Sequence, residues 1–296
     1  MRIIFCDSGF SHKEVDYMYR EEYAAAKAAG FSVSLISFEA LKRGKVDLAL
    51  KRVFNRFGEK VEAIYRGWML RPKQYKLLYN GLLSKNIHLI NEVSAYRFCH
   101  YLPESYEMIQ AFTPKTTFQK LTTDFDINDF KTLLKPFENQ SIIVKDYVKS
   151  QKHYWVEACF IPNANNLKHV EKIVKRFIEL QDVDLNEGLV FREFVELEAL
   201  TTHSKSGMPL TKEFRLFIKH GEIIQVFKYW DEGDYENVEP NLEPFKSIIG
   251  NINSNFFTMD IAKQKNGDWI IMELGDGQVS GLADNANRMD FYQSLR

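Results

Sequence analysis

The chain has 296 residues, of which 45% are hydrophobic and 27% charged, a globular composition with room for two or three domains. A formal net charge of -1 argues against nucleic acid or an anionic membrane as a partner. No apolar run approaches membrane-spanning length, the first residues turn polar after Cys6, and the three cysteines lie far apart. These features predict a cytoplasmic protein without a signal peptide, a membrane anchor or a disulfide framework.

The first third of the chain alternates between strand and helix patterns. Helices are predicted at 21–30 and 73–86, and strands at 2–8, 31–38, 62–68 and 87–91. Strands that alternate with helices predict a parallel sheet with crossover helices. No G-x-G-x-x-G follows the first strand, so a dinucleotide site there is unsupported.

From about residue 95 the pattern changes to helices followed by β-type runs. A helical stretch on both sides of Pro103 leads into runs typical of strands at 141–148, 153–161, 187–197 and 213–230. One helix is predicted at 166–183, and the polar stretch at 202–212 is predicted to be a mobile loop. Together with the first third, this order predicts an α+β fold.

The last strong pattern is a hairpin centred on Asn266-Gly267. A two-residue turn there places Asp260 directly opposite Glu273, on a face shared with apolar residues such as Ile271. Two like charges among apolar neighbours destabilise a sheet unless something neutralises them, and a hard cation such as Mg²⁺ favours carboxylate oxygens. The spacing alone leaves a solvent-exposed pair, with one carboxylate bound to a lysine, equally open.

Basic side chains near two predicted strands are candidates for phosphate binding. Lys145 lies inside an apolar run, and Lys149 follows it in a polar loop. Arg215 alternates with apolar residues in the first strand predicted at 213–230, and Lys228 lies in the second. The planar fork of an arginine matches phosphate oxygens. The alternatives are solvated lysines and a cross-strand salt bridge.

An apolar strand leads into Glu193-Phe194-Val195, with Glu196 and Glu198 after it. The backbone of such a segment can hold a flat purine, and an acid beside it can bind ribose hydroxyls. An edge strand with exposed acids is the alternative, and on this segment alone it is the better one.

Arg66 ends one of the strands of the first sheet. Ligands bind beyond the carboxyl ends of parallel strands, so Arg66 is a candidate substrate contact. A structural role fits the sequence equally well. No Ser-His-Asp or Cys-His signature is recognisable.

Taken in chain order, these segments resemble the ATP-grasp superfamily, and within it a bacterial and phage-associated clade named for one arginine and two lysines. The resemblance covers nearly the whole chain. It is carried by VKDYVKS at 144–150, REFVELE at 192–198, KEFRLF at 212–217 and MELGDGQVSGLAD at 272–284. It implies an α+β fold in which two subdomains, 96–200 and 201–296, grip ATP, preceded by a small Rossmann-like domain at 1–95.

The resemblance also gives each candidate residue a part in binding ATP and Mg²⁺. It implies phosphate contacts from Lys145 and Lys149, adenine contacts from Glu193, Phe194 and Val195, a ribose contact from Glu196 or Glu198, stabilisation of the transferring phosphoryl group by Arg215 and Lys228, and Mg²⁺ ligation by Asp260 and Glu273. The family usually has Glu-x-Asn at the metal site. Here Gly275 stands at the Asn position, so Asp276 is the candidate third ligand.

The function implied is an ATP- and Mg²⁺-dependent ligase that joins a carboxylate substrate to an amine, or to a thiol, through an acylphosphate. The 276–281 loop and Arg66 are candidates for the acceptor site. Two alternatives remain open: an ATP-binding regulatory module without turnover, and a phosphotransferase with the same ATP site. The oligomeric state is open as well.

Overall fold

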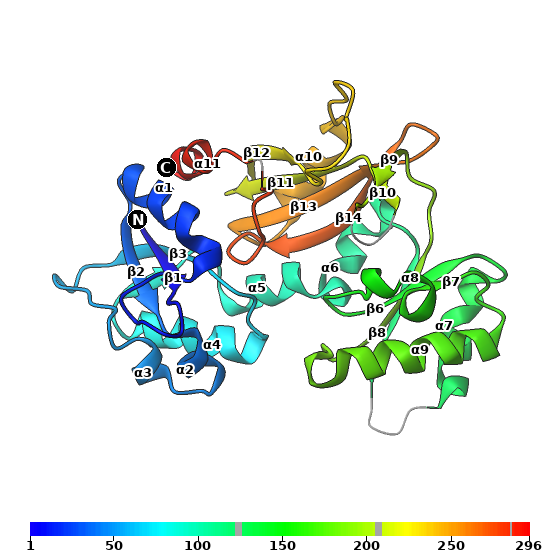
Figure 1. Ribbon diagram of the computed structural model, residues 1–296, viewed down its shortest axis with the longest axis horizontal. Coiled ribbons are helices and arrows are strands. Elements are labelled where there is room, and N and C mark those ends of the chain that lie inside the picture. Colours follow the sequence, from blue (N-terminus) through cyan, green and yellow to red (C-terminus); the bar gives the residue numbers. More distant parts are fainter. Residues whose placement is uncertain (122–125, 205–208, 285) are drawn as a thin grey trace.

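The computed structural model describes residues 1–121, 126–204, 209–284 and 286–296. Within these ranges the strands form three four-stranded sheets and one two-stranded sheet, with helices packed on them (Figure 1). One large sheet is parallel and two are antiparallel, which confirms the predicted α+β class. No helix in these ranges combines the length and the apolar character needed to cross a membrane.

The first sheet is parallel, in the order β2-β1-β3-β4. Its strands are Arg2–Cys6 (β1), Ser32–Ile36 (β2), Val61–Arg66 (β3) and Ile87–Leu89 (β4). The helices around it are Arg20–Ala28 (α1), Phe38–Lys42 (α2), Val46–Ala49 (α3) and Pro72–Leu83 (α4). Parallel neighbours need crossover connections, which these helices supply. The alternating pattern of the first third is thereby confirmed.

The last helix, Arg288–Ser294 (α11), returns to this first sheet. Phe291 and Tyr292 are fully buried in one cluster with Ile3 and Phe5 of β1. The N and C marks in Figure 1 accordingly lie close together, beside α1 and α11. The first sheet is therefore covered on one face by residues from both ends of the chain.

The second sheet is antiparallel, in the order β5-β8-β6-β7. Its strands are Thr116–Lys120 (β5), Ile142–Asp146 (β6), Phe160–Ile161 (β7) and Gly188–Glu193 (β8), and its helices are Lys131–Leu134 (α7), Trp155–Ala158 (α8) and Leu167–Gln181 (α9). The helix predicted at 166–183 is confirmed as α9. The strand predicted at 153–161 is wrong for most of its length, because the short helix α8 occupies it. The ring of Trp155 in this helix stacks on that of Phe160, with 5.5 Å between the ring centres.

The third sheet is antiparallel, in the order β12-β11-β13-β14. Its strands are Glu213–Lys219 (β11), Glu222–Lys228 (β12), Phe256–Lys263 (β13) and Trp269–Asp276 (β14). The helices beside it are Val93–His100 (α5), Leu102–Ile109 (α6) and Lys246–Asn251 (α10), and Figure 1 shows α5 and α6 running below β14 toward the second sheet.

The remaining elements are short. The two-stranded sheet pairs Ala199–Thr202 (β9) with Pro209–Thr211 (β10), at the ends of the loop predicted at 202–212. Residues 205–208 of that loop lie outside the described residues. Short 3₁₀ helices are Tyr17–Tyr19, Gln110–Phe112, Ile127–Phe130, Lys135–Phe137, Lys152–Tyr154, Asp182–Asp184 and Glu243–Phe245.

The closing hairpin differs from its prediction in one detail that matters. Gln264 pairs with Asp268, so the turn has a three-residue loop rather than two residues. A β-bulge between Asp260 and the next residue leaves Met272 of β14 without a partner and offsets this change. Asp260 therefore stands opposite Glu273, as predicted. The expectation that Ile271 shares their face is wrong, because the bulge turns it into the core.

Candidate functional site

Four charged residues meet between the second and third sheets. Arg215 of β11 is paired with Asp260 of β13, which is paired in turn with Glu273 of β14, so the three side chains form a row across the sheet. Arg215 binds Asp260 through two hydrogen bonds of 2.8 and 2.7 Å. Lys145 of β6 reaches Glu273 from the second sheet, with Nζ 2.8 Å from Oε1. Two of the predicted phosphate contacts, Lys145 and Arg215, and two of the predicted metal ligands, Asp260 and Glu273, thus form one cluster.

The sequence places this cluster through strand alternation. In β11 the core-facing residues are Phe214, Leu216 and Ile218, which are at most 4% exposed. Arg215 alternates with them and so lies on the other face. Lys145 is 6% exposed, which marks it as a buried ammonium with a partner rather than the solvated lysine that the sequence left open.

Opposite charges lie in pairs within the cluster. Burial alone would raise the pKa of Glu273, but Lys145 and the neighbouring cations together outweigh it and hold the pKa below its ordinary value. Burial likewise acts to lower the pKa of Arg215, and the acids beside it, Asp260 first, leave that pKa raised. Two carboxylates and two cations therefore balance one another, and of these Lys145 and Asp260 are buried.

The donor set fits Mg²⁺. Among the described residues no group of three or more acidic, histidine or cysteine side chains is arranged for a metal ion. Two carboxylates facing each other suit Mg²⁺, which is usually held by one or two carboxylates together with water and phosphate oxygens. Gly275, at the expected position of a third ligand, has no room for a side chain: a Cβ there would lie 2.6 Å from Thr258 Oγ1 and 2.7 Å from Ser280 Oγ.

Asp276, the candidate third ligand, does not join the pair. It lies on the other face of β14 and is fully buried. Its carboxylate accepts hydrogen bonds from Asn91 at 2.6 Å and from the backbone and side chain of Gln278 at 2.9 and 3.1 Å. β14 continues through residue 276, so the Asp276 side chain stays on the face opposite to Glu273. Its hydrogen bond with Asn91 links β14 to the segment that follows β4.

Asp276 gives a prediction for the pH dependence of stability. Burial raises its pKa from 3.8 to about 6, against the opposing hydrogen bonds from Asn91 and Gln278. The folded protein then holds this proton more tightly than the unfolded chain, so a contribution of about 3 kcal/mol, fully present below pH 4, is lost as the pH rises through 6. Between pH 4 and 7 the unfolding free energy of Asp276→Asn should fall less than that of the wild type by this amount. Urea denaturation measures it, and Asp268→Asn, at the exposed hairpin turn, should match the wild-type slope.

Lys228 lies in β12, where a second β-bulge changes its pairing. This bulge, between Phe217 and the next residue, shifts the β11–β12 register by one. Lys228 is consequently opposite Phe214; its side chain is exposed, with Nζ 5.2 Å from the centre of the Tyr235 ring, and it lines a hollow that Arg215 also lines. Its contact with the transferring phosphoryl group stays a prediction.

Tyr229 follows Lys228 and lies beside the cluster. Its ring lies 4.8 Å from the Arg215 guanidinium. Burial raises the pKa of Tyr229, and the charge of Asp260 adds to the shift. Lys152, in the loop after Lys145, adjoins the same cluster: loss of hydration acts to lower its pKa, but the acids around it leave the pKa raised. The bulge that presents Tyr229 has no sequence signal, whereas Lys152 belongs to a visibly lysine-rich loop.

Lys149 lies in the loop that follows β6. Its side chain is exposed, while its backbone N–H donates to Asp146 at 2.5 Å. Asp146 is fully buried and also accepts from Val148 and Asn186. A buried carboxylate thus fixes a loop that contains no glycine.

The predicted adenine segment lies where the chain passes from β8 to β9. Phe194 is 41% exposed, and its ring packs against Phe160 at 5.1 Å. Its backbone N–H donates to Ser141. The two acids predicted for ribose are engaged in ion pairs, Glu196 with Lys265 and Glu198 with Lys212 and Lys263, all at 2.8 Å.

Arg66, the candidate substrate contact, is a structural residue. It is 1% exposed, and its guanidinium binds both oxygens of Glu22 at 2.9 and 3.0 Å. Its remaining nitrogen donates to the carbonyls of Gly277 and Ser280 at 2.6 and 2.8 Å. Arg66 therefore contacts the 276–281 loop through its backbone carbonyls and links the loop to Glu22 of α1.

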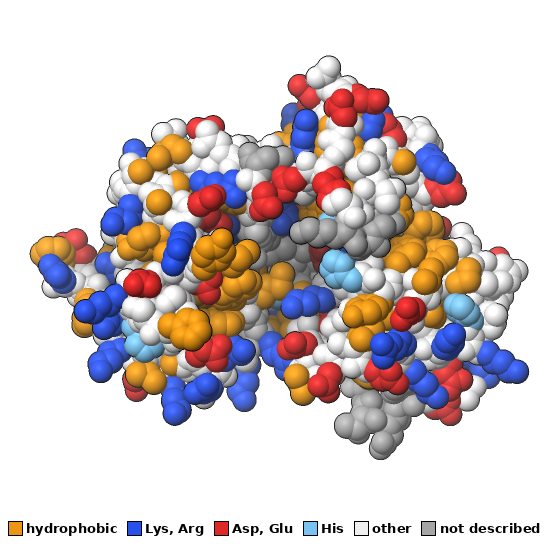
Figure 2. Space-filling model, viewed as in Figure 1, with side chains coloured by type: hydrophobic (Ala, Val, Ile, Leu, Met, Phe, Trp, Pro, Cys, Tyr) orange, Lys and Arg blue, Asp and Glu red, His pale blue; other side chains and the backbone are white. Residues whose placement is uncertain are grey.

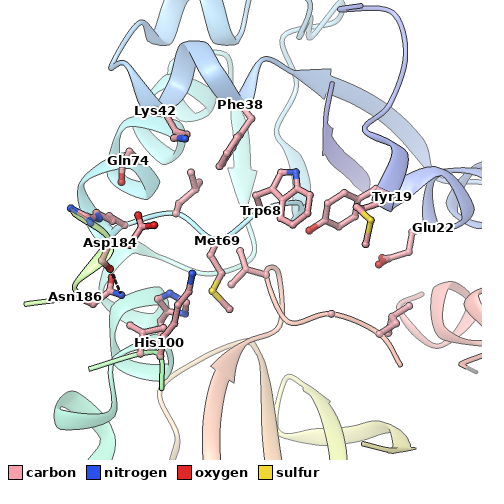
Figure 3. A pocket seen from close by; sticks show the side chains of 18 of the residues that line it. Tyr19, Glu22, Phe38, Lys42, Trp68, Met69, Gln74, His100, Asp184 and Asn186 are labelled. Atoms are coloured by element: carbon pink, nitrogen blue, oxygen red, sulfur yellow. Dashed lines mark hydrogen bonds between the residues drawn. The ribbon is translucent and has the colours of Figure 1, made fainter. Parts of the chain in front are cut away.

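A pocket of about 640 Å³ lies between the first domain and the other two. Its lining includes Trp68 and Met69 after β3, His100 at the end of α5, Lys149, and Asp284. Figure 2 shows the hollow, and Figure 3 shows residues of the first domain facing His100 across it. The pocket is within the size range of small-molecule sites. It lies at the carboxyl ends of the parallel strands, as expected for a ligand site.

The fold is that of an ATP-grasp domain. Residues 136–295 match the family model described as "ATP-grasp domain, R2K clade family 3", and the chain belongs to this family. The clade expected from the sequence is thereby confirmed. No curated protein sequence matches the chain.

Several solved structures share the whole fold at low sequence identity. D-cycloserine synthetase DcsG has 12% identity and a TM-score of 0.58, with 100% of this chain and 98% of that one covered. The ATP-grasp ligase PsnB, complexed with its minimal precursor, has 11% sequence identity and a TM-score of 0.58, and the match covers 99% of this chain and 97% of that one. A RimK domain ATP-grasp protein from Sphaerobacter thermophilus has 12% sequence identity and a TM-score of 0.61, and the match covers 99% of this chain and 97% of that one. The ATP-grasp fold therefore extends over nearly the entire chain.

Proposed function

We propose that this protein is an ATP- and Mg²⁺-dependent ligase that joins a carboxylate to an amine, or to a thiol, through an acylphosphate. The observation that carries the proposal is the cluster of Lys145, Arg215, Asp260 and Glu273 between two sheets, in which Lys145 and Asp260 are buried. Membership of the ATP-grasp family supports the ATP site. The names of similar structures, a synthetase and a peptide-bound ligase among them, support the reaction class.

In this proposal an oxygen of the substrate carboxylate attacks the γ-phosphorus of ATP, and the bond to ADP breaks. The amine nitrogen then attacks the acyl carbon, phosphate leaves, and the amine loses a proton. Phosphoryl transfer needs positioning and charge stabilisation more than covalent chemistry from the protein. Arg215 supplies a planar fork for phosphate oxygens, and Lys145 supplies a buried ammonium.

Mg²⁺ would be held by Asp260 and Glu273, and it would supply positive charge against the phosphates of ATP. The present ion pairs with Arg215 and Lys145 hold these two carboxylates in position. Binding of nucleotide would draw the two cations toward phosphate and leave both carboxylates to the metal. The absence of room at Gly275 is consistent with water completing the coordination.

The segment Glu193-Phe194-Val195, between β8 and β9, offers an exposed surface on which the nucleotide base can bind. Phe194 is exposed beside the backbone of Val195, and Trp155 and Phe160 support its ring. Aromatic faces and backbone groups together bind a purine without any charge. We assign the adenine to this segment, and the ribose to Glu198, whose pKa is lowered by hydrogen bonds from Lys212 and Lys263.

The missing third ligand side chain at Gly275 favours one alternative, an ATP-binding regulatory module without turnover. A phosphotransferase would use the same cluster, but its product would carry the phosphate. Release of ADP and free phosphate, measured with panels of acids and amines, separates the three. The ligase requires both products together with a new amide or thioester in the mass spectrum. ATP binding without ADP release across the panels would favour the regulatory module.

A further inference from the structure

The interdomain pocket has an apolar wall that phosphoryl transfer does not require. Met18, Trp68 and Met69 line it while remaining 66%, 39% and 46% exposed. Figure 3 shows Trp68 and Met69 on the same side of the pocket, and in Figure 2 hydrophobic side chains border the hollow on the first domain's side. Large apolar side chains gathered at a concave site mark a surface that a ligand covers.

This wall is preorganised. The indole nitrogen of Trp68 donates to Asp16 at 3.0 Å, and the ring meets Tyr19 edge to face at 5.6 Å. The side chain is therefore held before any ligand arrives. A fixed aromatic surface loses little conformational entropy when a ligand binds to it.

The far wall of the pocket is polar. Lys149 extends into it and makes no ion pair with any described residue. His100 lies beside it, and burial lowers the pKa of its imidazole to about 4, so the ring is neutral near pH 7. This pocket shares Gly281, Leu282 and Asp284 with a neighbouring hollow that Arg215 of the cluster lines.

The side chain of Gln74 offers a third contact for a ligand, because its oxygen is an unsatisfied hydrogen-bond acceptor. Gln74 of α4 lines the pocket, and its Oε1 is buried without a hydrogen-bond donor among the described residues. A buried acceptor without a partner is costly, and an N–H group of a ligand would satisfy it. The pocket thus offers an apolar surface, the ammonium groups of Lys149 and of Lys42, which pairs with Glu39, and one unsatisfied acceptor.

We propose that this pocket binds the carboxylate substrate, and that the substrate is an amino acid or short peptide with a bulky apolar side chain. The side chain lies on Trp68 and Met69, the carboxylate faces Lys149, and an N–H group reaches Gln74. That the bound carboxylate is then phosphorylated rests on the proposed ligase function, whereas binding of the amino acid or peptide in this pocket does not.

Calorimetry in the presence of Mg²⁺ and a non-hydrolysable ATP analogue tests the ligand class. L-phenylalanine and glycyl-phenylalanine should bind at least tenfold more tightly than glycine or L-glutamate. 3-Phenylpropionate should bind more tightly than 2-phenylethylamine, because only the former carries the carboxylate that faces Lys149. Equal affinities for phenylalanine and glycine, or a preference for 2-phenylethylamine, would overturn the inference.

Two variants test the wall itself. Trp68→Ala and Met69→Glu should each weaken phenylalanine binding tenfold or more while leaving affinity for the nucleotide analogue unchanged. Met69 is exposed, so its substitution leaves the fold intact. Phe57→Ala is the matched control, since Phe57 is 87% exposed and lies outside the pocket. Unchanged phenylalanine binding in both pocket variants contradicts the inference.

The two proposals fail separately. If phenylalanine binds as expected but no acid and amine release ADP, the ligase proposal falls and the pocket inference stands. If ADP release is driven only by small or charged acids, the ligase stands and the pocket inference falls.

Discussion

Glu273→Gln and Asp260→Asn should each lower Mg²⁺-dependent ADP formation by roughly 100-fold or more. Each substitution keeps the shape of the side chain but removes one of the two charges that would hold the metal. Glu273→Gln also leaves Lys145 buried without its counter-charge, 2.8 Å from a neutral amide. Initial rates of ADP release at several Mg²⁺ concentrations measure the effect, and raising Mg²⁺ should restore part of it.

The control for this prediction is Asp268→Asn. Asp268 lies at the exposed turn of the same hairpin, and among the described residues its carboxylate accepts a hydrogen bond from its neighbour Asn266 alone. Its substitution should leave the rate unchanged. Normal turnover by both Glu273→Gln and Asp260→Asn would refute the metal assignment, and with it the proposed ligase mechanism.

Arg66→Met should destabilise the fold by about 3–5 kcal/mol, because it leaves Glu22 buried without its counter-charge. Tyr292 would remain as the one described donor to this carboxylate, at 2.7 Å. The two carbonyls of the 277–280 segment would lose their donor as well. Urea denaturation followed by circular dichroism gives the change in unfolding free energy.

Arg43→Met is the comparison for this variant. Arg43 pairs with Glu39 at 3.9 Å on the surface, where such pairs contribute less than about 1 kcal/mol. A stable Arg66→Met protein with a raised KM for its acid substrate would instead return Arg66 to substrate binding, as the sequence first suggested.

The two hairpins of the third sheet explain what the sequence could predict. Glu273 was placed by counting from the Asn266-Gly267 turn, whereas Lys228 was assigned only to the second strand of its pair. Both hairpins contain a β-bulge, and each bulge shifts the pairing by one residue. In the closing hairpin the longer loop cancels the shift, so Glu273 stays in place. In the other nothing cancels it, and Lys228 stands opposite Phe214.

Sheet alternation and segment order were therefore readable, whereas single-residue irregularities were not. Lys145 and Arg215 were found because a charged residue inside an apolar alternating run is conspicuous. Arg66 was left open between a substrate contact and a structural role, because its partner Glu22 lies 44 residues away and no local pattern predicts an ion pair of that separation. Packing between distant segments decided whether a charge serves the fold or a ligand.

The return of α11 to the first sheet has a consequence for synthesis of the protein. The cluster that contains Ile3 and Phe5 also contains Phe291 and Tyr292, which are translated after the second and third sheets. Domains usually fold in the order in which they are made. Here β1 keeps part of its apolar surface uncovered until α11 has been translated, so the first sheet is completed after the two sheets that follow it in the sequence.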